Sequence, residues 1–154
     1  MAALAEGLLA RLRGQLEALP VVVGAASGER LRQRPASGAW SAHENLAHVA
    51  RHHEVMLERI ERMLREDGPA LSRYRAEEDP LWPAWASRSP EDVLKALREL
   101  RARLVAWVES LSVEEAARIG VHSTFGPMPI PAWLDFFLLH EAHHLYVALS
   151  RARG

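Results

Sequence analysis

Cysteine is absent from the 154 residues, which excludes disulfide bonds, thiolate metal ligands and a cysteine nucleophile. Imidazole and carboxylate groups are then the only strong metal ligands that the chain offers. Long apolar runs are missing too, since no stretch reaches the ~18 apolar residues of a membrane span. The Ala/Leu-rich start already contains Glu6, Arg11 and Arg13, unlike a secretory signal peptide. We therefore expect a soluble, cytoplasmic protein without a membrane partner.

An excess of one charge is also absent. Nineteen Lys and Arg stand against 20 Asp and Glu, for a formal net charge of −1, and the basic residues are spread along the chain. A nucleic-acid interface would need a basic patch or stripe, so we expect no nucleic-acid partner. Hydrophobic residues make up 49% and charged residues 25%, which is ordinary globular usage. The length predicts a single domain over 1–154.

Four segments have helical character, over about 3–23, 41–66, 89–110 and 130–151. The first has leucines at helical spacing. The second begins with Ser41 as N-cap and Glu44 three residues on, a capping box, and the third begins with Ser89 and Pro90. Residues 67–89 are interrupted by prolines and predict a long crossover, while 113–118 predict a short turn and 122–129 an irregular piece. The sequence predicts an all-α four-helix bundle with a long crossover between helices 2 and 3.

Histidine is the conspicuous residue type. Seven of the eight histidines fall in two clusters, at positions 43, 48, 52 and 53 and at positions 140, 143 and 144. At ~100° per residue, His140 and His144 point in the direction of Trp133, Phe136 and Phe137. Two imidazoles one turn apart can converge on one ion. One buried, hydrogen-bonded histidine beside a polar seam is the simpler interpretation of such a pair, but the second cluster favours a metal site.

The third ligand is left open by the periodicity of the second helix. Its apolar arc is centred on residues such as Leu46 and Ile60. On this helical wheel His53 lies inside the arc, His52 lies near its edge, and His48 lies on the polar border. The wheel thus nominates His53 or His52 and predicts that His48 is partly exposed.

Two stretches resemble the DinB-like superfamily. One is Gly38-Ala39-Trp40-Ser41-Ala42-His43-Glu44-Asn45-Leu46-Ala47-His48, and the other is Phe125-Gly126-Pro127-Met128-Pro129 followed by His140-Glu141-Ala142-His143-His144. The resemblance implies an up-up-down-down four-helix bundle in which His48, His140 and His144 bind zinc, nickel or a similar divalent ion. Many members carry Arg-Gly-Gln or Gln shortly after the paired histidines, whereas this chain continues Leu145-Tyr146-Val147-Ala148.

Three neutral imidazoles would leave coordination positions open, as in catalytic rather than structural sites. We expect a metal-dependent enzyme that acts on a small-molecule substrate, either a hydrolase or a thiol transferase that uses a low-molecular-weight thiol. Glu44, one turn before His48, is the candidate catalytic base, although its capping-box role is the simpler interpretation. For Trp40 and Trp82 we expect packing rather than a part in the pocket wall.

Two alternatives remain from the sequence. The chain could be a non-catalytic metal-binding protein, or a structural, stress-associated helical bundle. The last helix is apolar on most of its surface, with leucines around the histidines at positions 134, 138, 139, 145 and 149. A helix that is apolar all round is buried in a core or by a partner, so we expect a homodimer.

Overall fold

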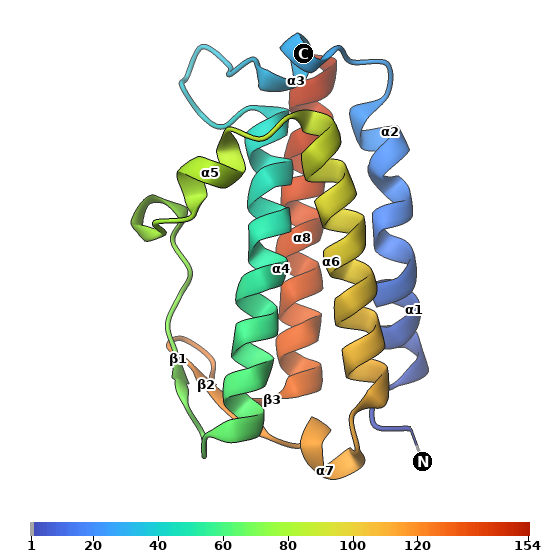
Figure 1. Ribbon diagram of the computed structural model, residues 1–154, viewed down its shortest axis with the longest axis vertical. Helices are drawn as coiled ribbons and strands as arrows, with labels where there is room; N and C mark the ends of the chain where they lie inside the picture. Colours follow the sequence, from blue (N-terminus) through green and yellow to red (C-terminus); the bar gives the residue numbers. More distant parts are fainter. Residues whose placement is uncertain (1) are drawn as a thin grey trace.

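Four rods of helix, packed side by side, form the body of the protein in a computed structural model that describes residues 2–154 (Figure 1). The first rod is α1 (Glu6–Gly14), a 3-10 turn η1 (Gln15–Ala18) and α2 (Leu19–Val23), and the others are α4 (Ala42–Arg65), α6 (Pro90–Ser110) and α8 (Ile130–Arg153). Short helices α3 (Gly28–Arg32), α5 (Trp82–Ala86) and α7 (Val113–Ala116) lie in the connections. The four-helix bundle is confirmed.

The long helices begin where their capping residues predict. At α4, Ser41 Oγ accepts from the Glu44 amide at 3.1 Å, and the Glu44 carboxylate accepts from the Ser41 amide at 2.8 Å, which completes the capping box. At α6, Ser89 Oγ accepts from the Asp92 amide, and Pro90 occupies the first turn. These side chains satisfy amides that the first helical turn leaves without a partner.

The helix directions differ from the order that the family resemblance implied. Figure 1 shows the first rod and α8 running one way along the bundle and α4 and α6 running the other way, which is up-down-down-up rather than up-up-down-down. The crossover between α4 and α6 explains the parallel pair, because it returns along the bundle from the end of α4 to the start of α6. It contains β1 (Ala70–Leu71), a 3-10 turn η2 (Ala76–Glu78) and α5.

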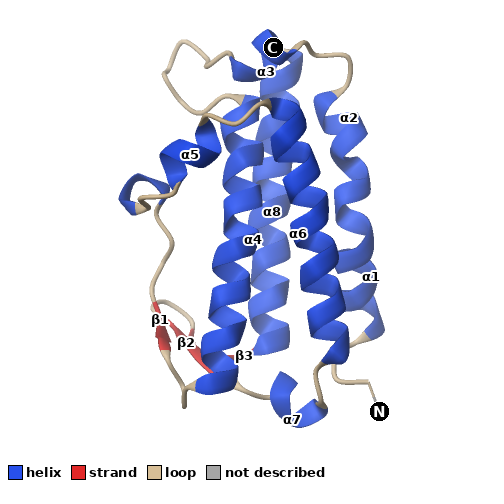
Figure 2. Cartoon of the chain, in the orientation of Figure 1, coloured by secondary structure: helices blue, strands red, loops and turns tan. Residues whose placement is uncertain are grey.

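A small sheet at one end of the bundle corrects the expected irregular piece (Figure 2). Strands β2 (Ile119–His122) and β3 (Gly126–Pro129) form an antiparallel hairpin, and β1 pairs with β2 in parallel. A Cβ atom at Gly120 would lie 2.6 Å from Leu71 Cδ1 and 2.8 Å from Met63 Sδ, so a larger residue in β2 would force the side chains of Leu71 and Met63 to shift. The first helix also differs from expectation, because the 3-10 turn interrupts it.

A buried ionic network crosses the core between the four rods. Arg101 of α6 forms an ion pair with Glu141 of α8, and donates to His53 Nε2 at 3.1 Å and to the Leu12 carbonyl at 2.7 Å. Gln15 donates to the second oxygen of Glu141 at 2.9 Å. Arg101 and Glu141 are 5% and 1% exposed, so each charge depends on this network for its partners.

Among residues 2–154, no helix combines the length and the apolar character that crossing a bilayer would require.

Candidate metal centre

The structure brings His48 of α4 together with His140 and His144 of α8. Each ring offers one nitrogen, and these three atoms lie within 4.8 Å of one another. The Nε2 atoms of His48 and His140 are 3.0 Å apart. Ligands of a tetrahedral zinc ion at ~2.0–2.1 Å are about 3.3 Å from each other, so small side-chain movements would bring all three nitrogens into bonding range.

Burial keeps all three imidazoles in the form that binds a metal. Burial and the neighbouring His144 lower the pKa of His48 to about 3. Burial and His143 lower the pKa of His144 to about 4, and burial with the adjacent histidines lowers the pKa of His140 to about 2. At neutral pH the three rings are therefore uncharged, and a lone pair is available on each.

Asn45 orients one of these rings. Its Oδ1 accepts a hydrogen bond from His144 Nδ1 at 2.8 Å, while its Nδ2 donates to the Ser41 carbonyl at 2.8 Å. The second bond fixes which end of the amide faces His144, so Nδ1 carries the proton and Nε2 is left as the free donor atom. Asn45 lies in the Trp-Ser segment, but sequence reasoning missed it. The signal that could have found it is its position three residues, about one helical turn, before His48.

The other two rings lack such support. The Nδ1 atoms of His48 and His140 are buried, and no group among residues 2–154 forms a hydrogen bond with them. Metal-bound histidines nearly always donate the second ring nitrogen to an acceptor. The three converging nitrogens suit a divalent ion, but only His144 is oriented by a hydrogen bond, and His48 and His140 are held by packing.

Aromatic side chains surround His48. Its ring centroid lies 5.0 Å from that of Trp40, 6.1 Å from that of Trp82 and 5.5 Å from that of Tyr74. Trp40 and Trp82 also stack on each other at 4.9 Å, as expected from their packing role. Both rings also pack beside His48, on the side of the ring away from the core.

Comparison with known proteins identifies the family and the fold. The family model for the DinB superfamily matches residues 8–148. The chain belongs to the DinB superfamily. The uncharacterized protein YuaE of Bacillus subtilis (strain 168) is 28% identical over 131 residues, which cover 77% of this chain and 81% of that protein. The structure of YfiT from Bacillus subtilis, described as a probable metal-dependent hydrolase with an unusual four-helix bundle topology, matches with a TM-score of 0.79 and 21% identity. That match covers 96% of this chain and 85% of YfiT, and it shows the shared DinB-like fold.

The remaining histidines of α4 have other surroundings. His53, which the helical wheel nominated, donates from Nδ1 to the Val49 carbonyl at 2.8 Å and accepts from Arg101, so both ring nitrogens are in use. His52 stacks against Phe137, with its ring centroid 4.2 Å from that of His140. His48 is only 6% exposed, so the predicted partial exposure is wrong. The crossover aromatics cover the side of α4 that the wheel assigned to solvent.

Glu44 is occupied by structural contacts. Its carboxylate accepts from the Ser41 amide and forms an ion pair with Arg34. Burial opposes the charged form, but the hydrogen bonds from Arg34 and Ser41 outweigh it and lower the pKa of Glu44. The capping-box interpretation is confirmed, and the catalytic role of Glu44 stays a prediction.

On α8, one expected orientation differs from the structure and another agrees with it. Phe136 is 36% exposed and packs against Phe125 outside the core, although the helical wheel grouped it with the inward residues. His143 is exposed and points away from the centre, as its position next to His144 predicted.

Proposed function

We propose that this DinB-superfamily chain is a metal-dependent enzyme that acts on a small molecule, with one divalent ion held by His48, His140 and His144. The observation that carries the proposal is the convergence of three buried, neutral imidazoles from α4 and α8. YfiT, which shares the fold, is described as a probable metal-dependent hydrolase, and this supports the same general class here.

The bound ion, zinc or nickel by preference, would supply Lewis acidity that activates water for hydrolysis or holds a low-molecular-weight thiol as thiolate. The protein's part follows from the described contacts. Asn45 keeps His144 in the tautomer that presents Nε2. Trp40 and Trp82 cover His48 and reduce its contact with water, which strengthens electrostatic interactions at the centre.

A metal-binding protein without turnover is the second candidate. It is favoured by the two Nδ1 atoms without partners, because ligands that lack such support bind metal about 10- to 100-fold more weakly.

Metal analysis tests the site first. After incubation with zinc or nickel and gel filtration, we expect about one ion per chain by mass spectrometry of the elements. His144→Ala should lose the ion, whereas His143→Ala, the exposed neighbour, should keep it. Wild-type protein that retains neither ion would refute the site.

Activity assays then separate the two candidates. The loaded protein is tested for hydrolysis of activated esters and for transfer of glutathione to an electrophile, with His144→Ala as the control in both. Turnover that disappears in His144→Ala supports the enzyme. A loaded protein that turns over neither substrate class favours the binding protein.

A further inference from the structure

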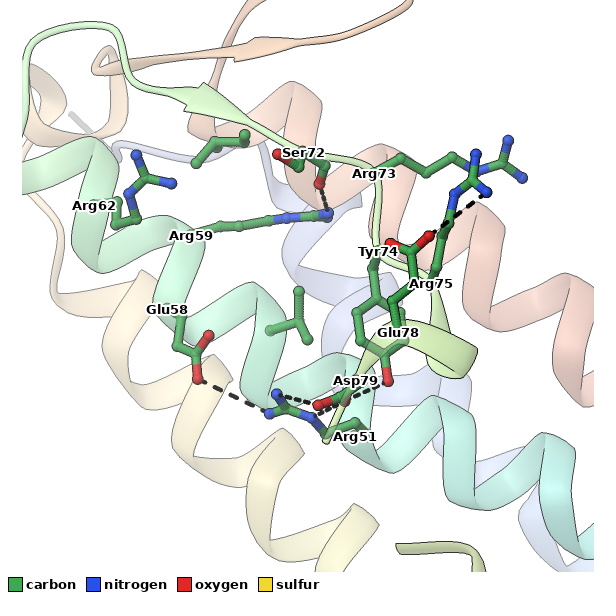
Figure 3. Close-up of a pocket in the computed structure, with 12 residues that line it drawn as sticks. Arg51, Glu58, Arg59, Arg62, Ser72, Arg73, Tyr74, Arg75, Glu78 and Asp79 are labelled. Carbon is green, nitrogen blue, oxygen red and sulfur yellow. Dashed lines mark hydrogen bonds and ion pairs between the residues drawn. The ribbon is translucent and has the colours of Figure 1, made fainter. Parts of the chain in front are cut away.

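An arginine-rich cavity lies beside the histidine centre, between α4 and the crossover. Its volume is about 320 Å³. Five arginines line it, against three carboxylates: Arg51, Arg59, Arg62, Arg73 and Arg75, with Glu58, Glu78 and Asp79. Figure 3 shows Arg59 reaching from α4 toward Ser72 of the crossover, with Arg73 and Arg75 extending from the crossover itself.

Most of these charges are already neutralised. Arg51 pairs with Asp79 at 2.7 Å, Arg62 pairs with Glu66 at 2.8 Å, and Arg75 lies 3.8 Å from Glu78. Arg59 is different. It donates to the Ser72 carbonyl at 2.8 Å and lies 5.2 Å from the ring of Trp133, but no carboxylate of residues 2–154 is within ion-pair distance.

Burial makes this arrangement costly. It lowers the pKa of Arg59 to about 10, so the guanidinium is still charged at neutral pH. A partly buried charge without a counter-ion is unfavourable, and the buried Arg51 and Arg101 both have carboxylate partners. A guanidinium has five N–H donors in a planar fork that matches a carboxylate or phosphate. One of the five is used by Ser72, and the others are free to bind an oxyanion.

The position of Arg59 connects the cavity with the histidine centre. Arg59 lies seven residues, about 10 Å, along α4 from His52 and eleven residues from His48, on the same face of the helix. The Arg59 guanidinium itself lies at the Ser72 carbonyl and over the Trp133 ring, so the link to the histidines runs through the cavity wall. Tyr74 is the shared wall, because it lines the cavity and its ring lies 5.5 Å from His48 and 5.8 Å from His52.

We propose that Arg59 is an oxyanion-binding residue, and that the small molecule which reacts at the histidine centre carries a carboxylate or phosphate group that Arg59 holds. This substrate class rests on the proposed function, but anion binding by Arg59 does not. Eleven residues of helix separate Arg59 from His48, a rise of about 16 Å, so the ligand would extend over roughly that distance past Tyr74.

The test is calorimetric titration of the full-length protein with succinate and, separately, with orthophosphate, in the metal-free and the zinc-loaded state at neutral pH. Charge-assisted hydrogen bonds are roughly twice as strong as neutral ones, so Arg59→Gln should weaken the preferred anion by about tenfold or more, and Arg59→Lys should weaken it less. The matched control is Arg65→Gln, on the same helix but outside the cavity and paired with Glu61. The tighter anion identifies the oxyanion as carboxylate or phosphate.

Saturable binding to metal-free protein that Arg59→Gln weakens and Arg65→Gln leaves unchanged supports the anion site, even if the metal site fails. No saturable binding of either anion to the wild type overturns it, as does an equal loss in both glutamine variants. Circular dichroism melting of each variant checks that it is folded. If Arg59→Gln unfolds, Arg59→Lys decides. A folded Arg59→Lys protein that still binds the anion one to one supports the site, and a folded Arg59→Lys protein that binds no anion overturns it.

Discussion

Replacing Asn45 by alanine removes the acceptor that holds the Nδ1 proton of His144. The hydrogen bond is 2.8 Å long, and Asn45 is 3% exposed, so water does not readily take the place of the amide. His144 would then change tautomer or rotate at little cost. Loss of such a partner weakens metal binding by about 10- to 100-fold, and we expect zinc affinity to fall by this factor.

The same substitution has a second effect that must be separated from the first. Asn45 also donates to the Ser41 carbonyl, and the loss of this bond should lower the free energy of unfolding by about 1 kcal/mol. Ser41→Ala is the matched control, because it removes the N-cap, with a similar loss of about 1 kcal/mol, but leaves the contact between Asn45 and His144 intact.

Competition with a chromophoric chelator measures the zinc affinity, and urea unfolding measures the stability. Asn45→Ala should lose both affinity and stability, whereas Ser41→Ala should lose stability alone. If Asn45→Ala binds zinc within about twofold of the wild type, its role in orienting His144 is refuted. If Ser41→Ala loses affinity to the same extent, general destabilisation rather than orientation is the cause.

Three further predictions follow from burial and charge. Burial and the Arg101 charge lower the pKa of His53 to about 3, against ~6.5 in the unfolded chain. Between these two pH values the unfolded chain binds a proton at His53 that the folded protein does not. The free energy of unfolding in urea should therefore fall as the pH drops below ~6.5, by up to about 1.4 kcal/mol per pH unit for each histidine with a lowered pKa. A free energy of unfolding that stays constant down to about pH 5 would contradict this prediction. Glu141→Ala leaves Arg101 buried without its carboxylate and should lower the free energy of unfolding by about 3–5 kcal/mol, and a loss typical of exposed pairs, under about 1 kcal/mol, would argue against the network. The homodimer stays a prediction, motivated by exposed Leu139 and Tyr146 on α8, and a monomer mass at all concentrations in sedimentation equilibrium would reject it.

Local signals predicted the long helices well because the residues that cause each boundary are neighbours in sequence. The capping box of Ser41 and Glu44 and the Ser89-Pro90 start depend on contacts within one turn. The hairpin of β2 and β3 was missed, since its strands are short, Pro127 and Pro129 interrupt the usual strand pattern, and β2 is also held by β1 from a distant segment.

The candidate site was predicted in part. The spacing of His140 and His144 placed both on one face of α8, but the helical wheel of α4 misjudged His48. A wheel assumes a single buried face, whereas α4 is covered on a second face by Trp82, Tyr74 and Asp79 of the crossover. His48 is buried by Trp40, just before α4, and by residues of the crossover and α8, and a helical wheel of α4 alone contains none of these contacts.

The ionic network did leave a signal in the sequence. Arg101 occupies a stripe position between Leu97 and Leu104, and Glu141 lies one turn after Phe137. A charged residue in each of two buried stripes predicts that the two charges meet, because an isolated one would be strongly unfavourable.

The network and the histidine centre occupy adjacent levels of the bundle. His53 follows His48 by five residues on α4, and Glu141 directly follows His140 on α8, with Arg101 joining them from α6. A shift of one residue along α8 would turn its side chains by about 100°, which would bury His140 or Ala142 opposite Arg101 and turn the histidines away from His48. A buried guanidinium that faces an apolar residue instead of its carboxylate is strongly destabilising, whereas one leucine can replace another in a packed core. The pair of Arg101 and Glu141 therefore disfavours such shifted packing far more than leucine contacts would. The same contacts that neutralise two buried charges therefore hold α8 at the rotation that brings His140 and His144 to His48.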